Sequence, residues 1–280
     1  MMIPPPSSAV EQLGALLSHH TGQELTEARR WRIETSLRPL LRARNIASLD
    51  ALLLALEREP RGALLSETLD AMLNHESSFF RDIGVFRNLE EKILPKLAAQ
   101  SRDKVLRIWC AGCSTGQEAY SLAMMVRRME IFRDWRVTIR ATDISEPAIV
   151  KARQGRYAQM DMQRGLPIGE LLRWFEPIGT EWQIADEIRN MVSFYADNLL
   201  KSSCVPGVFD LILCRNLLFY FPESLRPRAR DQLALRARAG TYLVLGAGEL
   251  LPPNDPLFAN CRDMRCSYVA GRLPKAAPQD

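Results

Sequence analysis

The feature that most constrains the fold is residues 107–125, RIWCAGCSTGQEAYSLAMM, where an apolar run passes through small residues into helical spacing. Leu106, Ile108 and Trp109 are typical of a buried strand, and the spacing of Ala119, Leu122 and Val126 is typical of a helix. The sequence therefore predicts a strand, a tight loop and a helix, the unit with which α/β proteins build ligand sites.

The loop of this unit contains Gly112 and Gly116, which lack a Cβ and let the backbone bend and approach a ligand. The first N–H groups of the following helix point back into the loop, so a nucleotide-like ligand is one interpretation. A plain strand-to-helix turn is the other, because the two glycines do not make the G-x-G-x-x-G pattern of dinucleotide sites.

A second apolar segment, residues 135–141, ends at Asp143. In doubly wound sheets an acid at the end of the second strand can accept both ribose hydroxyls of an adenosine. Alternatively, Asp143 caps the helix that begins near Glu146, although Ser145 can supply that cap itself. We favour the ribose interpretation.

Composition excludes several classes of protein. The chain has 280 residues, of which 47% are hydrophobic and 25% charged, as expected for one large domain and a smaller one. No stretch approaches the roughly 20 apolar residues of a membrane span, and the start lacks the layout of a signal peptide. We therefore expect a cytoplasmic protein without membrane insertion. The net charge of +4 permits an acidic partner but does not indicate a nucleic-acid binder.

Six cysteines in a chain of this length argue against a disulfide scaffold. Cys110 and Cys113 form a C-x-x-C pair, but no second pair has the spacing of a zinc site. We interpret these cysteines as small buried hydrophobic residues and expect no metal site.

Residues before position 75 show helical spacing and no strand pattern, with helices expected at 10–19, 26–44, 48–57 and 63–74. In the second helix Ile33 and Leu37 lie on one stripe, and Arg32, Arg38 and Arg42 lie on the other side. These arginines form either a solvated face or a docking surface for an acidic partner. Pro39 should kink or interrupt this helix.

Residues 75–82, HESSFFRD, form a junction in which the paired phenylalanines are expected in a core and Arg81 can reach a cofactor carboxylate. Further strands are expected at 182–184, 191–194, 209–213, 241–245 and 266–270, and helices at 145–155, 169–175 and 223–238. The strands at 182–184 and 191–194 are predicted to pair through a charged turn. The strand at 209–213 ends in Cys214, Arg215 and Asn216, again at the edge where ligands bind.

Together, residues 74–82, 108–122, 141–144, 198–199 and 209–220 resemble the CheR-type chemotaxis-receptor glutamate methyltransferases. The resemblance implies a class I methyltransferase fold of the α/β class, with a mostly parallel sheet, a small N-terminal all-α domain and a small antiparallel β-subdomain. It implies a flexible leader at 1–8, a helical receptor-docking domain at 9–74, a catalytic domain at 75–273 with the β-subdomain at 180–194, and a disordered tail at 274–280.

The resemblance also implies the reaction, in which a methyl group passes from S-adenosylmethionine to glutamate side chains of chemoreceptors, leaving S-adenosylhomocysteine. The implied catalytic residues are Tyr220 and Arg81. The implied cofactor-binding residues are His75, Ser77, Arg81, Glu118, Asp143, Asn198, Leu199, Arg215 and Asn216. Three positions depart from the family pattern: His75 replaces the usual Asn, Ser77 the usual Thr, and Gln117 a frequent Glu.

The implied partner is the cytoplasmic helical domain of chemoreceptors, bound by a monomer without nucleic acid. Some family members are tethered to a receptor-tail peptide by the β-subdomain. Because the stretch 180–194 looks too short for that, we expect direct docking through Arg32, Arg38 and Arg42. A nucleic-acid methyltransferase and a cofactor-binding adaptor without turnover are the alternatives. A glutamate carboxylate is ionised at pH 7, so its methylation needs orientation rather than a strong base.

Overall fold

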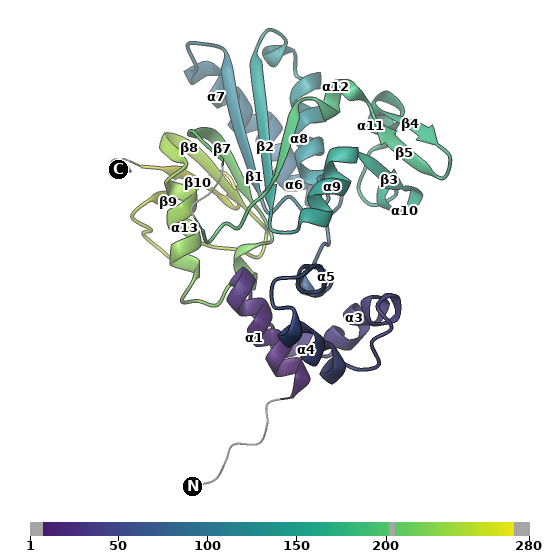
Figure 1. Ribbon diagram of the computed structural model, residues 1–280. Helices are drawn as coiled ribbons and strands as arrows, with labels where there is room; N and C mark the ends of the chain where they lie inside the picture. The colour runs from purple at the N-terminus through teal and green to yellow at the C-terminus, as the bar shows by residue number, and fades with distance from the viewer. Residues whose placement is uncertain (1–7, 202–204, 272–280) are drawn as a thin grey trace. The chain divides into compact units, whose positions relative to one another are not determined.

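The computed structural model describes residues 8–201 and 205–271, and their contacts divide the chain into two compact units (Figure 1). The helical unit comprises the residues up to Asn74 together with Tyr220–Leu225, and the catalytic unit comprises His75–Phe219 and the residues from Arg226 onward. The predicted leader and tail lie outside the described residues, except Ser8, which caps the first helix.

The helical unit contains α1 (Ala9–Thr21), α2 (Glu27–Arg30), α3 (Arg32–Ala43), α4 (Leu49–Arg58) and α5 (Ala63–Met72). Ser8 and Glu11 form a capping box at the start of α1, and left-handed Gly22 ends that helix. Fully buried leucines form the core of the unit: Leu13, Leu17, Leu37 and Leu52.

The predicted helix at 26–44 is interrupted, but not at the predicted position. Trp31 separates α2 from α3, whereas Pro39 lies inside α3. Proline removes one N–H from the helix ladder and crowds the carbonyl four residues earlier, but α3 is held in place by Leu37 in the apolar core, with Leu40 packed against that core. Burial of the apolar stripe therefore outweighs the local cost of the proline.

The catalytic unit is built on a seven-stranded sheet of order β6-β2-β1-β7-β8-β10-β9. The first four pairings are parallel, and β10 runs antiparallel to both β8 and β9. The strands of this sheet are β1 (Val105–Ala111), β2 (Arg136–Asp143), β6 (Val192–Ala196), β7 (Phe209–Cys214), β8 (Ala237–Leu245), β9 (Phe258–Asn260) and β10 (Ser267–Ala270).

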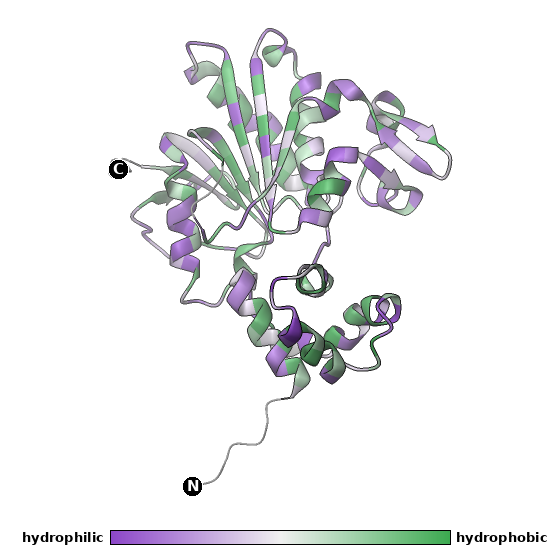
Figure 2. Cartoon of the chain, in the orientation of Figure 1, coloured by the Kyte–Doolittle hydropathy of each residue, from purple (hydrophilic) through white to green (hydrophobic). Residues whose placement is uncertain are grey.

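Helices cover this sheet, and α8 and α9 pack against β2 and β6. Every residue of β7 is buried, as expected for a central parallel strand with both faces covered, and Figure 2 shows the central strands mostly in the green of apolar residues. The helical segments of the unit are α6 (Ile83–Asn88), η1 (Leu89–Ile93), α7 (Leu94–Gln100), α8 (Gln117–Arg128), η2 (Glu130–Phe132), α9 (Glu146–Gln154), α10 (Gln159–Met162), α11 (Ile168–Trp174), α12 (Asp186–Arg189) and α13 (Arg226–Ala234), with η3 (Leu218–Tyr220) at its boundary.

The small antiparallel sheet differs from the one predicted at 180–194. It consists of β3 (Arg156–Ala158), β5 (Glu181–Ile184) and β4 (Phe175–Ile178), in the order β3-β5-β4. The expected partner strand near 191–194 is β6, which pairs with β2 in the large sheet, and the charged turn is the helix α12. The prediction of a hairpin was wrong because sequence spacing does not reveal which sheet a strand joins.

Three further elements differ from the prediction. The helix expected at 223–238 ends at Ala234, and β8 begins at Ala237, four residues earlier than the predicted strand. The edge strand β9 was not predicted. Within residues 8–201 and 205–271, no helix has both the length and the apolar character required to cross a membrane.

Candidate functional site

Several predicted site residues of the catalytic unit lie at or just after the ends of parallel strands. Strands β6, β2, β1 and β7 run in one direction, so their carboxyl ends meet at one edge of the large sheet. The strand order reverses between β1 and β7, and ligands of open α/β sheets bind at such a reversal. Gly112, Asp143, Asn198 and Arg215 come directly after or at the ends of these four strands.

Asp143, the last residue of β2, organises the loops around it. One carboxylate oxygen accepts the N–H of Ser114 at 2.7 Å, and the other accepts the N–H of Ser145 at 3.0 Å. The cap of α9 is supplied by Ser145, whose Oγ accepts the N–H of Ala148 at 3.0 Å. A carboxylate has about four lone-pair positions, so a carboxylate at a strand end is a suitable acceptor for hydroxyl groups.

The loop after β1 is held from several sides. Gly112 and Gly116 have φ values of 78° and 93°, which only glycine adopts without strain. The Ser114 hydroxyl donates to the carbonyl of His75 at 3.0 Å, and the buried Tyr157 hydroxyl of β3 donates to the carbonyl of Thr115 at 2.8 Å. Burial raises the pKa of Tyr157, which therefore stays a neutral donor. The small sheet thus braces the loop.

Left-handed residues other than glycine gather in the segments of this edge. Phe80, Asp82, Ser114 and Asn216 have φ values of 48°, 59°, 49° and 56°. Each such conformation costs about 1–3 kcal/mol unless the surroundings impose it, and such residues cluster at ligand sites. The backbone here is therefore set by its contacts rather than by local preference.

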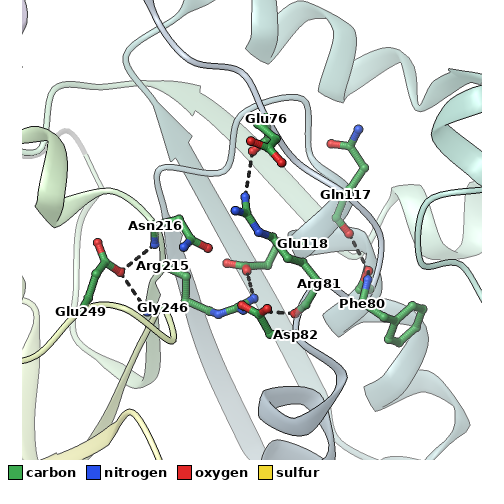
Figure 3. A network of polar contacts seen from close by, with 11 residues as sticks. Glu76, Phe80, Arg81, Asp82, Gln117, Glu118, Arg215, Asn216, Gly246 and Glu249 are labelled. Carbon is green, nitrogen blue, oxygen red and sulfur yellow. Dashed lines mark hydrogen bonds and ion pairs between the residues drawn. The ribbon is translucent and has the colours of Figure 1, made fainter. Parts of the chain in front are cut away.

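Arg215 lies at the centre of a buried ionic cluster, which Figure 3 shows with its partners. Its side chain is 0% exposed and pairs with Asp82 at 2.6 Å and with Glu118, whose side chain is 13% exposed. It also donates to the carbonyl of Arg81 at 3.1 Å. Among the described residues its Nε finds no hydrogen-bond partner. The guanidinium is enclosed by protein, so its contacts orient Glu118 and residues 81–82.

Arg81 was predicted to bind a cofactor carboxylate. Its Nη1 donates to the carbonyl of Glu76 at 3.1 Å, and its side chain is half-buried (Figure 3). The preceding N–H, of Phe80, donates to Ser121 Oγ of α8 at 2.9 Å. This contact fixes residues 75–82, including the partly buried His75 and Ser77, against α8.

Asn198 and Leu199 lie beside Asp143. The N–H of Asp197 donates to the carbonyl of Asp143 at 2.8 Å, and Asn198 Oδ1 accepts the N–H of Leu200 at 2.9 Å. Leu199 is buried. The catalytic unit therefore brings Asp143, Asn198 and Leu199 together, and the Arg215 cluster joins Arg81 to Glu118.

Glu249 is a residue of this edge that the sequence did not single out. Its buried carboxylate accepts the N–H groups of Asn216 at 2.7 Å, Leu218 at 2.7 Å and Gly246 at 2.9 Å. An acid three residues after a strand-ending glycine was the available signal. Asp82 was also missed as a partner of Arg215.

Tyr220, the predicted catalytic tyrosine, belongs to the helical unit. Its hydroxyl accepts a hydrogen bond from Asn74 Nδ2, its carbonyl accepts the N–H of Glu24 at 2.8 Å, and the Arg29 guanidinium lies 4.6 Å from its ring centroid. Arg32, Arg38 and Arg42 are all exposed on α3. The two sets of predicted residues are thus carried by separate units.

The cysteines of the first loop and of β7 are buried. Burial and the charge of Glu118 raise the pKa of Cys110, and burial also raises the pKa of Cys113 and Cys214. Neutral buried thiols are poor nucleophiles and poor metal ligands. In the described parts of the chain no group of three or more His, Cys, Asp or Glu side chains has the arrangement of a metal site.

Comparison with known proteins decides the family. Residues 75–266 match the family model described as "CheR methyltransferase, SAM binding domain". The chain belongs to this family. The methyltransferase is 33% identical to "Chemotaxis protein methyltransferase Cher2" of Pseudomonas putida over 86% of this chain and 90% of that protein. It is 34% identical to "Chemotaxis protein methyltransferase 1" of Pseudomonas aeruginosa over 86% and 89%.

This methyltransferase therefore has the class I fold and uses S-adenosylmethionine in chemotaxis, as the sequence predicted. The donor set at the sheet edge fits that cofactor. Arg81 is a cation suited to a carboxylate, Glu118 is an anion suited to an ammonium group, and Asp143 is a carboxylate of the kind that accepts the hydroxyls of a diol.

Proposed function

We propose that this methyltransferase acts on glutamate side chains of the cytoplasmic helical domain of chemoreceptors, as a cytoplasmic monomer. The observation that carries the proposal is the joining of Arg81, Glu118 and Asp143 at one sheet edge inside a matched CheR domain. The relatives' names, chemotaxis protein methyltransferases, support the chemotaxis substrate.

We assign the cofactor contacts as follows. Asp143 accepts hydrogen bonds from the ribose hydroxyls, Arg81 pairs with the methionine carboxylate, and Glu118 takes the ammonium group. The remaining contacts are assigned to His75, Ser77, Asn198, Leu199 and Asn216. Arg215 acts through Glu118, because its own side chain is fully buried. When bound, S-adenosylmethionine supplies a methyl group on a positively charged sulfur.

The substrate carboxylate needs no general base, since it is ionised at neutral pH. The protein's task is to hold one carboxylate oxygen in line with the methyl group and to exclude water. Tyr220 is assigned to this step. Asn74 donates to its hydroxyl oxygen, and a phenol hydroxyl can also donate, which is the role that we assign to it toward the substrate carboxylate.

Docking is assigned to the arginines of α3. Arg38 and Arg42 line a hollow of about 920 Å³ on the helical unit, together with the apolar Leu41 and Ile46. Glu34 and Asp50 also line it. An amphipathic helix with acidic residues matches this mixture, since its apolar side meets the leucine and its carboxylates meet the arginines. Arg32, whose guanidinium lies 5.7 Å from the Trp31 ring centroid, is exposed in the first turn of α3.

The small sheet has three strands and is larger than the stretch 180–194 suggested, so its length no longer argues against tethering. The edge strand β4 supplies a different argument. The N–H of Ala185 donates to the carbonyl of Trp174, so in this register Pro177 directs its backbone nitrogen away from β5. Proline has no N–H there, and an added peptide strand would find no donor at that position. We therefore retain direct docking. Tight binding of a receptor C-terminal peptide would contradict it.

The function is tested by incubating the protein with radiolabelled S-adenosylmethionine and a chemoreceptor cytoplasmic fragment. We expect label in the fragment that is released as methanol by mild base, because glutamate methyl esters hydrolyse readily. Fragments with the methylated glutamates changed to alanine serve as the control. Label in RNA or DNA instead, or cofactor binding without any transfer, would overturn the proposal.

A further inference from the structure

Glu249 binds backbone from two different segments of the catalytic unit (Figure 3). Its carboxylate follows β8 and accepts the N–H of Gly246 in its own loop. It also accepts N–H groups of residues 216, 218 and 219, in the loop after β7. A buried anion with this many backbone donors holds its loop firmly, because leaving those donors unpaired is costly.

The two carboxylate oxygens of Glu249 accept hydrogen bonds from different residues. Oε2 accepts from Asn216 at 2.7 Å and from Gly246 at 2.9 Å. Oε1 accepts from Leu218 at 2.7 Å and from Phe219 at 3.4 Å. One oxygen therefore holds the left-handed residue assigned to the cofactor, and the other holds the two residues that lead directly to Tyr220.

Gly246 completes the arrangement. A Cβ at this position would lie 2.7 Å from Glu249 Oε2, 2.8 Å from Asn216 Nδ2 and 2.9 Å from Asn216 N. Such distances are shorter than van der Waals contact, and the main-chain nitrogen cannot move aside freely. The glycine therefore allows the close approach of the carboxylate to the loop.

We propose that Glu249 is a positioning residue for methyl transfer: its carboxylate sets Asn216 toward the cofactor and fixes residues 218 and 219, which directly precede Tyr220 in the chain. This inference rests on the proposed roles of Asn216 and Tyr220. It predicts that Glu249, which is buried, is energetically coupled to both residues.

The test uses Glu249→Gln in the full-length protein. The amide keeps one acceptor oxygen and replaces the other with an NH₂ group, which cannot accept an N–H. We expect affinity for S-adenosylhomocysteine, measured by calorimetry, to fall about 10-fold, as for loss of a charge-assisted bond. We expect the single-turnover rate constant for methylation at saturating cofactor to fall by a similar factor.

Double-mutant cycles separate a specific positioning role of Glu249 from a nonspecific loss of order in the catalytic unit. In the Glu249→Gln background, Tyr220→Phe should lose most of its effect on turnover, and Asn216→Ala most of its effect on S-adenosylhomocysteine affinity. Gly246→Ala, which displaces the carboxylate without changing charge, should behave in the same way. The matched control is Asp210→Asn, since Asp210 is another buried acid that accepts a backbone N–H, from Arg107 at 2.8 Å, near the start of β7.

Full additivity in both cycles, or equal coupling of Asp210→Asn, would overturn the proposal. Gly246→Ala keeps it testable if Glu249→Gln does not fold. If the wild type binds S-adenosylhomocysteine but methylates no receptor, the assigned substrate is wrong. In that case the affinity cycle with Asn216→Ala still decides the role of Glu249.

Discussion

The carboxyl edge of the large sheet and the outer face of α3 both carry arginines, but in opposite settings. Arg215 is fully enclosed and held by two carboxylates and a carbonyl, whereas Arg38 and Arg42 are exposed beside a hollow. Enclosed charges keep most of their interaction energy, while exposed ones are screened over about 8 Å at physiological ionic strength. The first region therefore has fixed geometry, and the second is the surface that we propose for docking.

The largest effect is expected from Asp143→Ala. Loss of charge-assisted bonds to two ribose hydroxyls, about 1.5–3 kcal/mol each, should reduce affinity for S-adenosylhomocysteine at least about 100-fold. The change also leaves the N–H groups of Ser114 and Ser145 without their acceptor, so the melting temperature should fall while the protein still folds. Calorimetry and thermal melting measure the two effects. Normal affinity would show that the ribose assignment is wrong.

Arg215→Met tests how much the enclosed arginine contributes to the free energy of unfolding. Removing the cation leaves Asp82 and Glu118 without their shared partner, which should lower the free energy of unfolding by about 3 kcal/mol. Arg133→Met is the control, because Arg133 and its partner Glu130 are both largely exposed. Urea unfolding of both variants measures the difference, and equal losses would contradict the special role of the enclosed cluster.

Tyr220→Phe removes a single hydroxyl from the helical unit. We expect turnover to fall at least about 10-fold, as when one positioned donor is lost. Affinity for S-adenosylhomocysteine should stay within about twofold, because the ring and its contact with Arg29 remain. Steady-state kinetics with a receptor fragment gives the first value and calorimetry the second. Unchanged turnover would remove Tyr220 from the reaction.

The smallest effect is expected from Arg38→Glu/Arg42→Glu. KM for the receptor fragment should rise several-fold, and the wild-type KM should itself rise with salt, since exposed charges mainly tune encounter. The control pair Arg102→Glu/Arg133→Glu makes the same change in net charge on exposed positions of the catalytic unit. If both pairs alter KM equally, the effect belongs to net charge and the α3 face has no special part.

The features predicted correctly from the sequence are those that depend on a local residue pattern. The apolar run before Gly112 and the acid at the end of the second strand sufficed for β1, β2 and their shared edge, because parallel strands fix where their ends lie. The cap by Ser145 was also predictable, since helix starts have a strong residue preference.

Contacts between distant segments were not predictable. The hairpin expected at 182–194 was wrong because strand 192–196 finds its partner in β2, some fifty residues earlier in the chain, and no spacing rule states that pairing. Glu249 was missed for a related reason. Its partners are backbone N–H groups about thirty residues away, and backbone donors are the same for every sequence.

The separation of Tyr220–Leu225 from the first 74 residues has a consequence for synthesis on the ribosome. The helical unit cannot acquire its last piece until residue 225 has been translated, although its helices emerge first. At about 5–20 residues per second, the intervening chain takes on the order of ten seconds to appear. During that interval Asn74 and Glu24 lack the tyrosine that they contact in the finished protein. The nascent helical unit therefore lacks residues 220–225 while the strands up to β7 are being translated.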